Sequence, residues 1–314
     1  MKIVVTGGAG FIGANVVRRL LLSESATDIQ IVDDLSTGTA ENLEGLPVVL
    51  HEGSILDGDL LGAVFEGAQA VIHLAARPSV PRSIADPLAS HDANATGTVR
   101  VLEAARHSAV RHMIVASSSS VYGSNPVLPK HEDLVPSPVS PYAVSKLATE
   151  AYALAWAHCY GLDVLAFRFF NVFGPWQRPG HDYAAVLPAF LDAALAGRPL
   201  PIHGDGKQTR DFTYVGSVAN VITAAIETGT SFAGPVNLAF GSRRSLLDVV
   251  GAIENQLEKR LPRQHADPRP GDVRHSQADQ TLLRHLFPDI QPVPFETGLA
   301  ATIEWFRTLG PEYG

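Results

Sequence analysis

Residues 2–20 read KIVVTGGAGFIGANVVRRL, and this stretch decides the fold of the chain. The run IVV is typical of a strand, and the apolar residues after Gly10 recur at helical spacing. Glycines between the two elements allow a tight turn and close approach of the backbone to a pyrophosphate, which the helix N-terminus would attract. The stretch therefore predicts a strand, a helix and between them a dinucleotide-binding loop made of Gly7, Gly10, Phe11, Ile12 and Gly13.

An acidic residue at the end of the second predicted strand indicates which dinucleotide binds. Asp33 follows Gly13 by 20 positions, at the end of the run IQIVD. A carboxylate at this place can accept hydrogen bonds from both hydroxyls of the adenosine ribose, and it would repel a 2′-phosphate. The sequence therefore favours NAD over NADP as the cofactor.

The first half of the chain alternates apolar strand patterns with amphipathic helical stretches. KIVVTG, IQIVDD, AVIHLAA, HMIVASS and DVLAFRFF are nearly continuous in apolar residues. Strands of this kind are buried on both faces, which is typical of a parallel sheet covered by helices. We therefore expect an α/β fold, with a Rossmann-type doubly wound parallel sheet and an NAD-binding domain over residues 1–170.

The composition of the sequence changes beyond Gly174. Proline and glycine become frequent, as in GRPLPIHGDGKQ, and helices alternate with short extended pieces. We expect residues 171–314 to form a smaller mixed α/β lobe that binds the substrate over the carboxyl edge of the sheet. Residues 211–236 read as one more strand and helix, which we expect to return to the first domain.

Charge and composition exclude several classes of partner. The 314 residues carry a formal net charge of −8, and no block of lysine and arginine could follow a nucleic acid or an anionic membrane surface. No apolar run approaches the roughly 20 residues of a membrane span, and the chain opens with a strand pattern rather than an export signal. We expect a cytoplasmic protein in which the single cysteine, Cys159, is a small core residue.

A tyrosine and a lysine four residues apart in PYAVSK, residues 141–146, carry the chemistry. Residues at this spacing share one face of a helix, so the ammonium of Lys146 is expected to favour the phenolate of Tyr142. Ser118, at the end of a predicted strand, could hydrogen-bond the reacting oxygen of a substrate and share its proton. The histidines have no metal-ligand spacing, and no metal is needed for this chemistry.

Six motifs in this order resemble the extended short-chain dehydrogenase/reductases, in particular the nucleotide-sugar epimerases and dehydratases: TGGAGFIG, VDDLSTG, HLAA, SSSSVYG, PYAVSK and FRFFNVFGP. The resemblance runs over nearly the whole chain. It implies a Ser118–Tyr142–Lys146 triad, with Tyr142 as the acid and base and Lys146 also on the nicotinamide ribose. It further implies a homodimer, and cofactor contacts from Asp34, Ser36, Leu74, Ala75, Ala76 and Asn94.

The residues after Ser118 indicate the reaction. Similar dehydratases carry an Asp-Glu pair before the tripeptide VYG, and similar decarboxylases usually carry a glutamate there, whereas this chain has Ser119 and Ser120. Without an additional acid or base, the simplest fate of a 4-keto sugar is to recover its hydride on the opposite face. The sequence therefore favours an NAD-dependent UDP-sugar 4-epimerase, an isomerase. A dehydratase, a decarboxylase, a sugar reductase and a non-catalytic NAD-binding protein remain alternatives.

The resemblance also implies how the substrate is held. Arg210 and Arg269 would clamp the diphosphate, Asp272 would orient Arg269, and Asn171 would donate to the diphosphate or the sugar. Arg178 matches an arginine near the sugar carboxylate in UDP-glucuronate 4-epimerases. With Ser119 and Ser120 it favours UDP-glucuronate, while the small Ser276 leaves UDP-glucose and UDP-N-acetylglucosamine as alternatives.

Overall fold

The structure, a computed structural model, describes residues 1–179, 185–267 and 273–310. Its centre is a seven-stranded sheet with the strand order β11-β6-β5-β4-β1-β2-β3, in which each pair of neighbours is parallel. These strands are β1 (Lys2–Thr6), β2 (Asp28–Asp33), β3 (Val49–Glu52), β4 (Ala70–His73), β5 (His112–Ser118), β6 (Asp163–Phe169) and β11 (Pro235–Leu238). The predicted Rossmann-type parallel sheet is confirmed.

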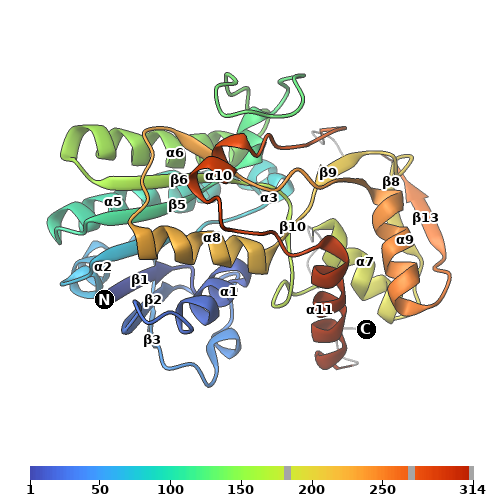
Figure 1. The fold of residues 1–314 in the computed structure, drawn as a ribbon, viewed down its shortest axis with the longest axis horizontal. Coiled ribbons are helices and arrows are strands. Elements are labelled where there is room, and N and C mark those ends of the chain that lie inside the picture. The colour runs from blue at the N-terminus through green and yellow to red at the C-terminus, as the bar shows by residue number, and fades with distance from the viewer. Residues whose placement is uncertain (180–184, 268–272, 311–314) are drawn as a thin grey trace.

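Helices cover both faces of this sheet (Figure 1). One face packs against α1 (Phe11–Leu20) and α8 (Val215–Thr228). The other face packs against α2 (Gly58–Phe65), α5 (Gly97–His107) and α6 (Pro141–Tyr160). Both faces are thus buried, which explains the nearly continuous apolar runs of the strands.

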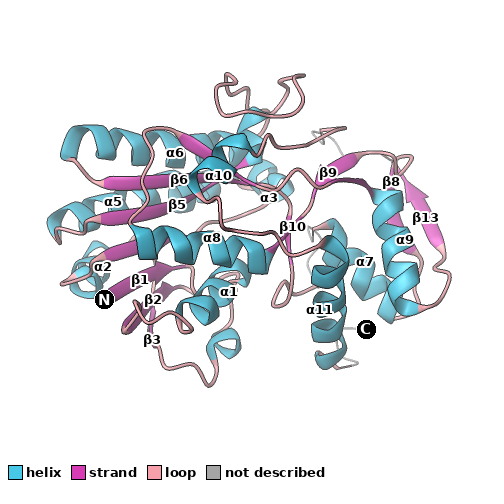
Figure 2. Ribbon diagram, in the orientation of Figure 1, coloured by secondary structure: helices cyan, strands magenta, loops and turns pink. Residues whose placement is uncertain are grey.

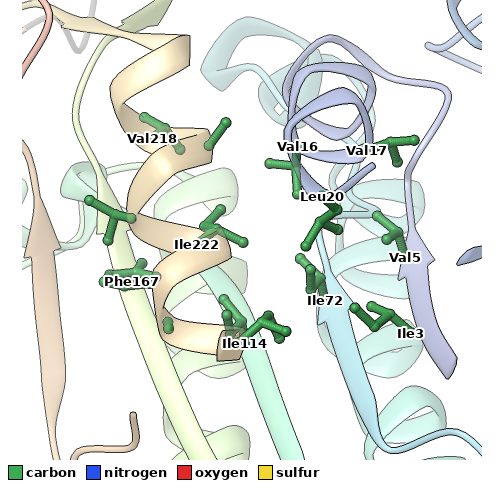
Figure 3. Close-up of a cluster of buried hydrophobic side chains, with 14 of the residues drawn as sticks. Ile3, Val5, Val16, Val17, Leu20, Ile72, Ile114, Phe167, Val218 and Ile222 are labelled. Carbon is green, nitrogen blue, oxygen red and sulfur yellow. The ribbon is translucent and has the colours of Figure 1, made fainter. Parts of the chain in front are cut away.

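Successive residues of a strand point to opposite faces, and β1 shows this directly. Ile3 and Val5 belong to the core under α1 and α8, whereas Val4 belongs to the core on the opposite face. Figure 3 shows the first of these cores, in which Leu20 of α1 and Ile222 of α8 approach the strands from the same side.

Shorter elements lie between the strands or after the last of them. They are the 3₁₀ turns η1 (Ala40–Leu43) and η3 (Ser119–Tyr122), α3 (Val80–Ala85), α4 (Pro87–His91), the π-helical turn η2 (Asp92–Thr96) and α10 (Thr281–Leu286). The turn η3 directly follows β5, so it lies at the carboxyl edge of the sheet, where ligands bind in open α/β folds.

A smaller group of elements lies beside this edge (Figure 2). Its helices are α7 (Val186–Leu195), α9 (Leu246–Leu257) and α11 (Phe295–Thr308), which share one apolar core. Its short strands pair as β7 (Val172–Phe173) with β10 (Thr213–Tyr214), β8 (Leu200–His203) with β13 (Arg263–Ala266), and β9 (Thr209–Asp211) with β12 (Arg243–Ser245).

Between these groups the chain passes back to the large sheet. α8 packs against α1, and β11 pairs with β6. A domain boundary near residue 170, with residues 171–314 as the substrate lobe, stays a prediction.

Two further observations concern the surface. Cys159, near the end of α6, is exposed, so its expected place in the core is wrong, because the last three residues of this helix all face solvent. Within the described ranges, no helix combines the length and the apolar character that crossing a membrane requires.

Candidate active site

The candidate catalytic residues meet where β5 ends and α6 begins. β5 ends at Ser118, and the Ser140 side chain caps α6 by accepting a hydrogen bond from the backbone N–H of Ala143. Tyr142 and Lys146 lie one turn apart in this helix. The side chain of Ser118 is close enough to the phenol of Tyr142 to lower the pKa of that group. The structure therefore brings together the three residues that the sequence predicted to form a triad.

Burial shifts the proton affinities of both helix residues. It raises the pKa of Tyr142, and the side chain of Ser118 opposes that rise. Burial also lowers the pKa of Lys146 to about 8, while its ammonium donates a 2.8 Å hydrogen bond to the carbonyl oxygen of Ala116. The net pKa shift of Tyr142 is thus upward, opposite to the lowering that we expected from Lys146, because dehydration of the phenolate outweighs the favourable contacts.

A neutral histidine, His73, lies close enough to Lys146 to sense its charge. Nδ1 of His73 is 2.7 Å from Oγ1 of Thr6, and its Nε2 is 3.0 Å from Oγ1 of Thr98. Burial and the charge of Lys146 lower the pKa of His73 to about 3. His73 is therefore an uncharged core residue near neutral pH. Among the described residues, no group of three histidine, cysteine or acidic side chains could hold a metal ion.

The glycine loop fits a pyrophosphate. Gly7 has a φ of +74°, and a Cβ on it would lie 2.5 Å from the backbone nitrogen of Ala75. A Cβ on Gly13 would lie 2.2 Å from the carbonyl oxygen of Gly7. No side chain caps α1 at Gly10, so the first N–H groups of the helix, beginning with Phe11, are left for a ligand.

Asp33 fits the ribose that such a ligand would carry. Its Oδ2 accepts a hydrogen bond from the N–H of Ala9 at 2.9 Å, and its Oδ1 accepts one from Leu35 at 2.9 Å. Burial raises the pKa of this carboxyl group. A carboxylate has about four acceptor sites, so two remain for the ribose hydroxyls. Asp34 accepts from the backbone and hydroxyl of Ser36, which orders the exposed turn after β2.

One other predicted cofactor segment lies beside the glycine loop, and Asn94 is joined to the loop that follows it. Leu74, Ala75 and Ala76 directly follow β4, and Ala75 abuts Gly7 as described above. Asn94 is buried and binds both the N–H and the carbonyl of Arg77, while its amide also donates to Oγ of Ser145 at 2.9 Å. Asn94 therefore joins the loop after β4 to α6. A direct contact of these residues with the cofactor stays a prediction.

A cavity of about 270 Å³ opens beside Ser118. Four of the predicted substrate residues line it: Ser119, Ser120, Asn171 and Arg210, and Ser276 does so as well. Oγ of Ser120 is buried and has no hydrogen-bond partner among the described groups. A buried hydroxyl normally has a partner, and a sugar hydroxyl would supply one here. Among the described residues that line this cavity, none is a carboxylate.

Arg178 lies elsewhere. It does not line the cavity, and its Nη2 forms an ion pair with the carboxylate of Glu41 in η1. The predicted place of Arg178 near the sugar carboxylate stays a prediction. Arg269 and Asp272 lie outside the described residues.

The sequence pattern did not predict several residues that line the site. Lys130 and His275 line the cavity, although they come from segments that are far apart in the chain. The backbone N–H of Lys130 donates to the carbonyl of Gln277 at 2.8 Å, which brings the two segments together. Nor did the pattern predict a buried ion pair between Glu150 and Arg168, although an arginine within the apolar run AFRFF was a visible signal.

Comparisons with known proteins agree with this geometry. The NAD dependent epimerase/dehydratase family matches residues 3–239. The UDP-glucose 4-epimerase of Mycolicibacterium smegmatis is 38% identical over 315 residues, which cover 98% of this chain and 99% of that protein.

Two solved structures extend the comparison. The UDP-N-acetylglucosamine 4-epimerase of Methanobrevibacter ruminantium M1, in complex with UDP-N-acetylmuramic acid, has a TM-score of 0.92 at 36% identity, covering 98% of this chain and 99% of that one. The UDP-glucuronic acid 4-epimerase of Bacillus cereus, in complex with UDP-glucuronic acid and NAD, has a TM-score of 0.91 at 31% identity, covering 99% of this chain and 100% of that one.

Proposed function

The chain belongs to the NAD-dependent epimerase/dehydratase family and uses NAD as its cofactor, and from this premise we propose that it inverts C4 of a UDP-hexose through a 4-keto sugar. The observation that carries the proposal is the pairing of Ser118 with Tyr142 beside a cavity whose described walls hold no carboxylate.

Tyr142 moves the proton of the sugar hydroxyl. Its phenolate accepts the proton from O4, and the resulting phenol returns the proton after the ketone has turned over, while Ser118 hydrogen-bonds the same oxygen and shares the proton. Lys146, on the same face of α6, supplies a positive charge that favours the phenolate, whereas burial raises the pKa of Tyr142. When bound, NAD supplies the hydride acceptor for the hydrogen at C4.

The lining of the cavity favours epimerisation over elimination. Loss of water from the sugar needs an acid for the leaving hydroxyl and a base for the neighbouring carbon. Ser119 and Ser120 stand at the positions where similar dehydratases carry an Asp-Glu pair, and they offer hydroxyls only. The 4-keto sugar is therefore expected to recover its hydride on the opposite face.

We further propose that the sugar is an uncharged hexose. The uronate favoured by the sequence rested on Arg178 together with Ser119 and Ser120. The side chain of Arg178 pairs with Glu41 and does not line the cavity. The hydroxyls of Ser118 to Ser120 and the amide of Asn171 are neutral partners that suit sugar hydroxyls. Of the relatives named above, one is named for UDP-glucose, one for UDP-N-acetylglucosamine and one for UDP-glucuronic acid.

UDP-glucuronate is the second candidate, because Lys130 lines the same cavity and is only 3% exposed. A buried cation of this kind could bind a carboxylate.

The test incubates purified protein with UDP-glucose, UDP-N-acetylglucosamine and UDP-glucuronate separately, and follows each by mass spectrometry and proton NMR. We expect products of equal mass that differ at C4, with the highest kcat/KM for an uncharged sugar. Loss of water or carbon dioxide would contradict the proposal, as would stoichiometric consumption of added NADPH. A preference for UDP-glucuronate would favour the second candidate.

A further inference from the structure

A buried ion pair joins the helix of Tyr142 to the neighbouring strand. Arg168 lies on β6, and its guanidinium donates two hydrogen bonds to the carboxylate of Glu150, at 2.9 Å from Nε and 2.6 Å from Nη2. The two side chains are 3% and 4% exposed. Glu150 follows Lys146 by four residues, as Lys146 follows Tyr142. The ion pair therefore occupies the next turn of the helix face that carries the catalytic groups.

Ser117 connects this ion pair to the end of β5. Its hydroxyl is buried, donates to Oε2 of Glu150 at 2.8 Å, and lies 3.4 Å from the carbonyl oxygen of Lys146. The next residue is Ser118, whose side chain acts on the pKa of Tyr142. Glu150 is itself a residue of α6, the helix that carries Tyr142. Its carboxylate contacts β5, the strand that carries Ser118.

Arg168 also contacts η3, the turn that directly follows Ser118. Its guanidinium carbon lies 4.6 Å from the centroid of the Tyr122 ring, and its Nη1 donates to the carbonyl of Glu132 at 3.3 Å. Tyr122 ends η3 and lines the cavity, and its hydroxyl donates to Oδ1 of Asn237 at 2.7 Å. The pair therefore contacts the chain both before and after Ser118.

A buried ion pair is weak evidence for stability, because the dehydration of two charges offsets their attraction. A bidentate contact between arginine and a carboxylate is nevertheless directional, so it fixes the relative position of the two elements that carry it. We propose that Glu150 and Arg168 are positioning residues, which set α6 against the ends of β5 and β6 and thereby hold Tyr142 in reach of Ser118 and of the sugar oxygen. This inference rests on the epimerase activity proposed above.

The test is the double variant Glu150→Met/Arg168→Met, assayed as the holoenzyme with NAD. Removing both charges leaves no unpaired buried charge, so the melting temperature is expected to stay near that of the wild type or to rise. Displacement by about 1 Å can lower a rate about 100-fold, and we expect kcat to fall about 30-fold while KM changes less than about threefold. NAD content is expected to stay unchanged.

A matched control removes a different ion pair with the same substitutions. Asp192 and Arg198 form an exposed pair at the end of α7, with a nitrogen–oxygen distance of 2.6 Å. The variant Asp192→Met/Arg198→Met is expected to keep the wild-type kcat. If it lost activity to the same extent as the first variant, the loss would reflect the substitutions and not the position of the pair.

The pH profile separates positioning from a general loss of structure. Ser118 lowers the pKa of Tyr142, so loss of this contact is expected to raise that pKa. The acid limb of the profile, where kcat rises with pH as Tyr142 loses its proton, should then move to higher pH. A smaller fraction of folded enzyme would lower kcat without moving this limb. A folded double variant with the wild-type kcat, or with a lower kcat and an unmoved limb, would overturn the proposal.

Ser117→Ala keeps the proposal testable if the double variant does not fold. It removes one hydroxyl and leaves both charges paired, and we expect kcat to fall about fivefold with the same shift of the acid limb. An unchanged kcat and profile in this variant would contradict the role of the pair. If the wild type epimerises no UDP-hexose, the proposed function fails instead.

Discussion

The ammonium of Lys146 donates a 2.8 Å hydrogen bond to the carbonyl oxygen of Ala116, two residues before Ser118. This contact anchors the lysine under the site, yet burial lowers its pKa to about 8 from the ordinary 10.5. The folded protein thus holds a cation that water would solvate better. Activity and stability are therefore expected to respond in opposite directions when Lys146 is replaced.

We predict that Lys146→Met abolishes epimerisation and raises the free energy of unfolding by up to roughly 3 kcal/mol at pH 7, the equivalent of the pKa difference. Because the folded pKa is the lower one, the unfolded wild type binds more protons between pH 8 and 10.5, and its stability rises with pH there. Urea unfolding across this range should show a flatter curve for the variant. Lys207→Met, at an exposed lysine, is the control, and an equal gain of stability there would contradict the account.

Tyr142→Phe is expected to lower kcat by about a thousandfold or more, because the phenol is the proposed acid and base. The ring remains, so NAD should still co-purify in the wild-type ratio, measured by absorbance after denaturation. Tyr152→Phe, at an exposed tyrosine of the same helix, should leave kcat unchanged. An active Tyr142→Phe enzyme would remove this residue from the mechanism.

Arg178→Ala is expected to change kcat/KM by similar factors for UDP-glucose and UDP-glucuronate, because Arg178 pairs with Glu41 outside the cavity. Glu41→Gln removes the other charge of the pair, and it should also change kcat/KM for the two substrates by similar factors. Both side chains are partly exposed, so each variant should lose no more than about 1 kcal/mol of stability. A loss of kcat/KM confined to UDP-glucuronate would contradict this expectation and support a contact of Arg178 with the sugar carboxylate.

Acid should destabilise the protein through His73. Its folded pKa of about 3 lies below the ordinary 6.5, so the unfolded chain binds more protons between these values and stability falls as the pH falls through this range. The full contribution is roughly 5 kcal/mol. Chemical unfolding from pH 7 to pH 4 should be less steeply pH-dependent in His73→Gln, whereas His107→Gln, at an exposed histidine, should follow the wild type. Equal slopes in all three proteins would refute this assignment.

Local patterns were sufficient to predict the fold, and they identified the candidate catalytic face. Gly7 and Gly13 identify the dinucleotide loop because no side chain fits at those turns, and Tyr142 and Lys146 are paired by helical spacing alone. The residues that make up each of these signals lie close together in the chain, so the signals can be recognised from the sequence alone.

Contacts between distant segments could not be predicted in this way. The pairing of Arg178 with Glu41 joins residues 137 positions apart, and nothing in either segment specifies the other. The same holds for Lys130, which enters the cavity wall through a loop that pairs with Gln277. The direction of the pKa shift of Tyr142 also depends on burial, which the spacing of residues does not reveal.

The central claim is that the hydrogen removed from C4 returns to the same carbon while Tyr142 handles only the hydroxyl proton. Proton NMR of UDP-glucose incubated with the holoenzyme in deuterium oxide tests it most directly. The account predicts an equilibrium mixture of the two C4 epimers, with no deuterium on any sugar carbon and no change in mass. Deuterium at C3, C4 or C5, or a product lacking water, would contradict it.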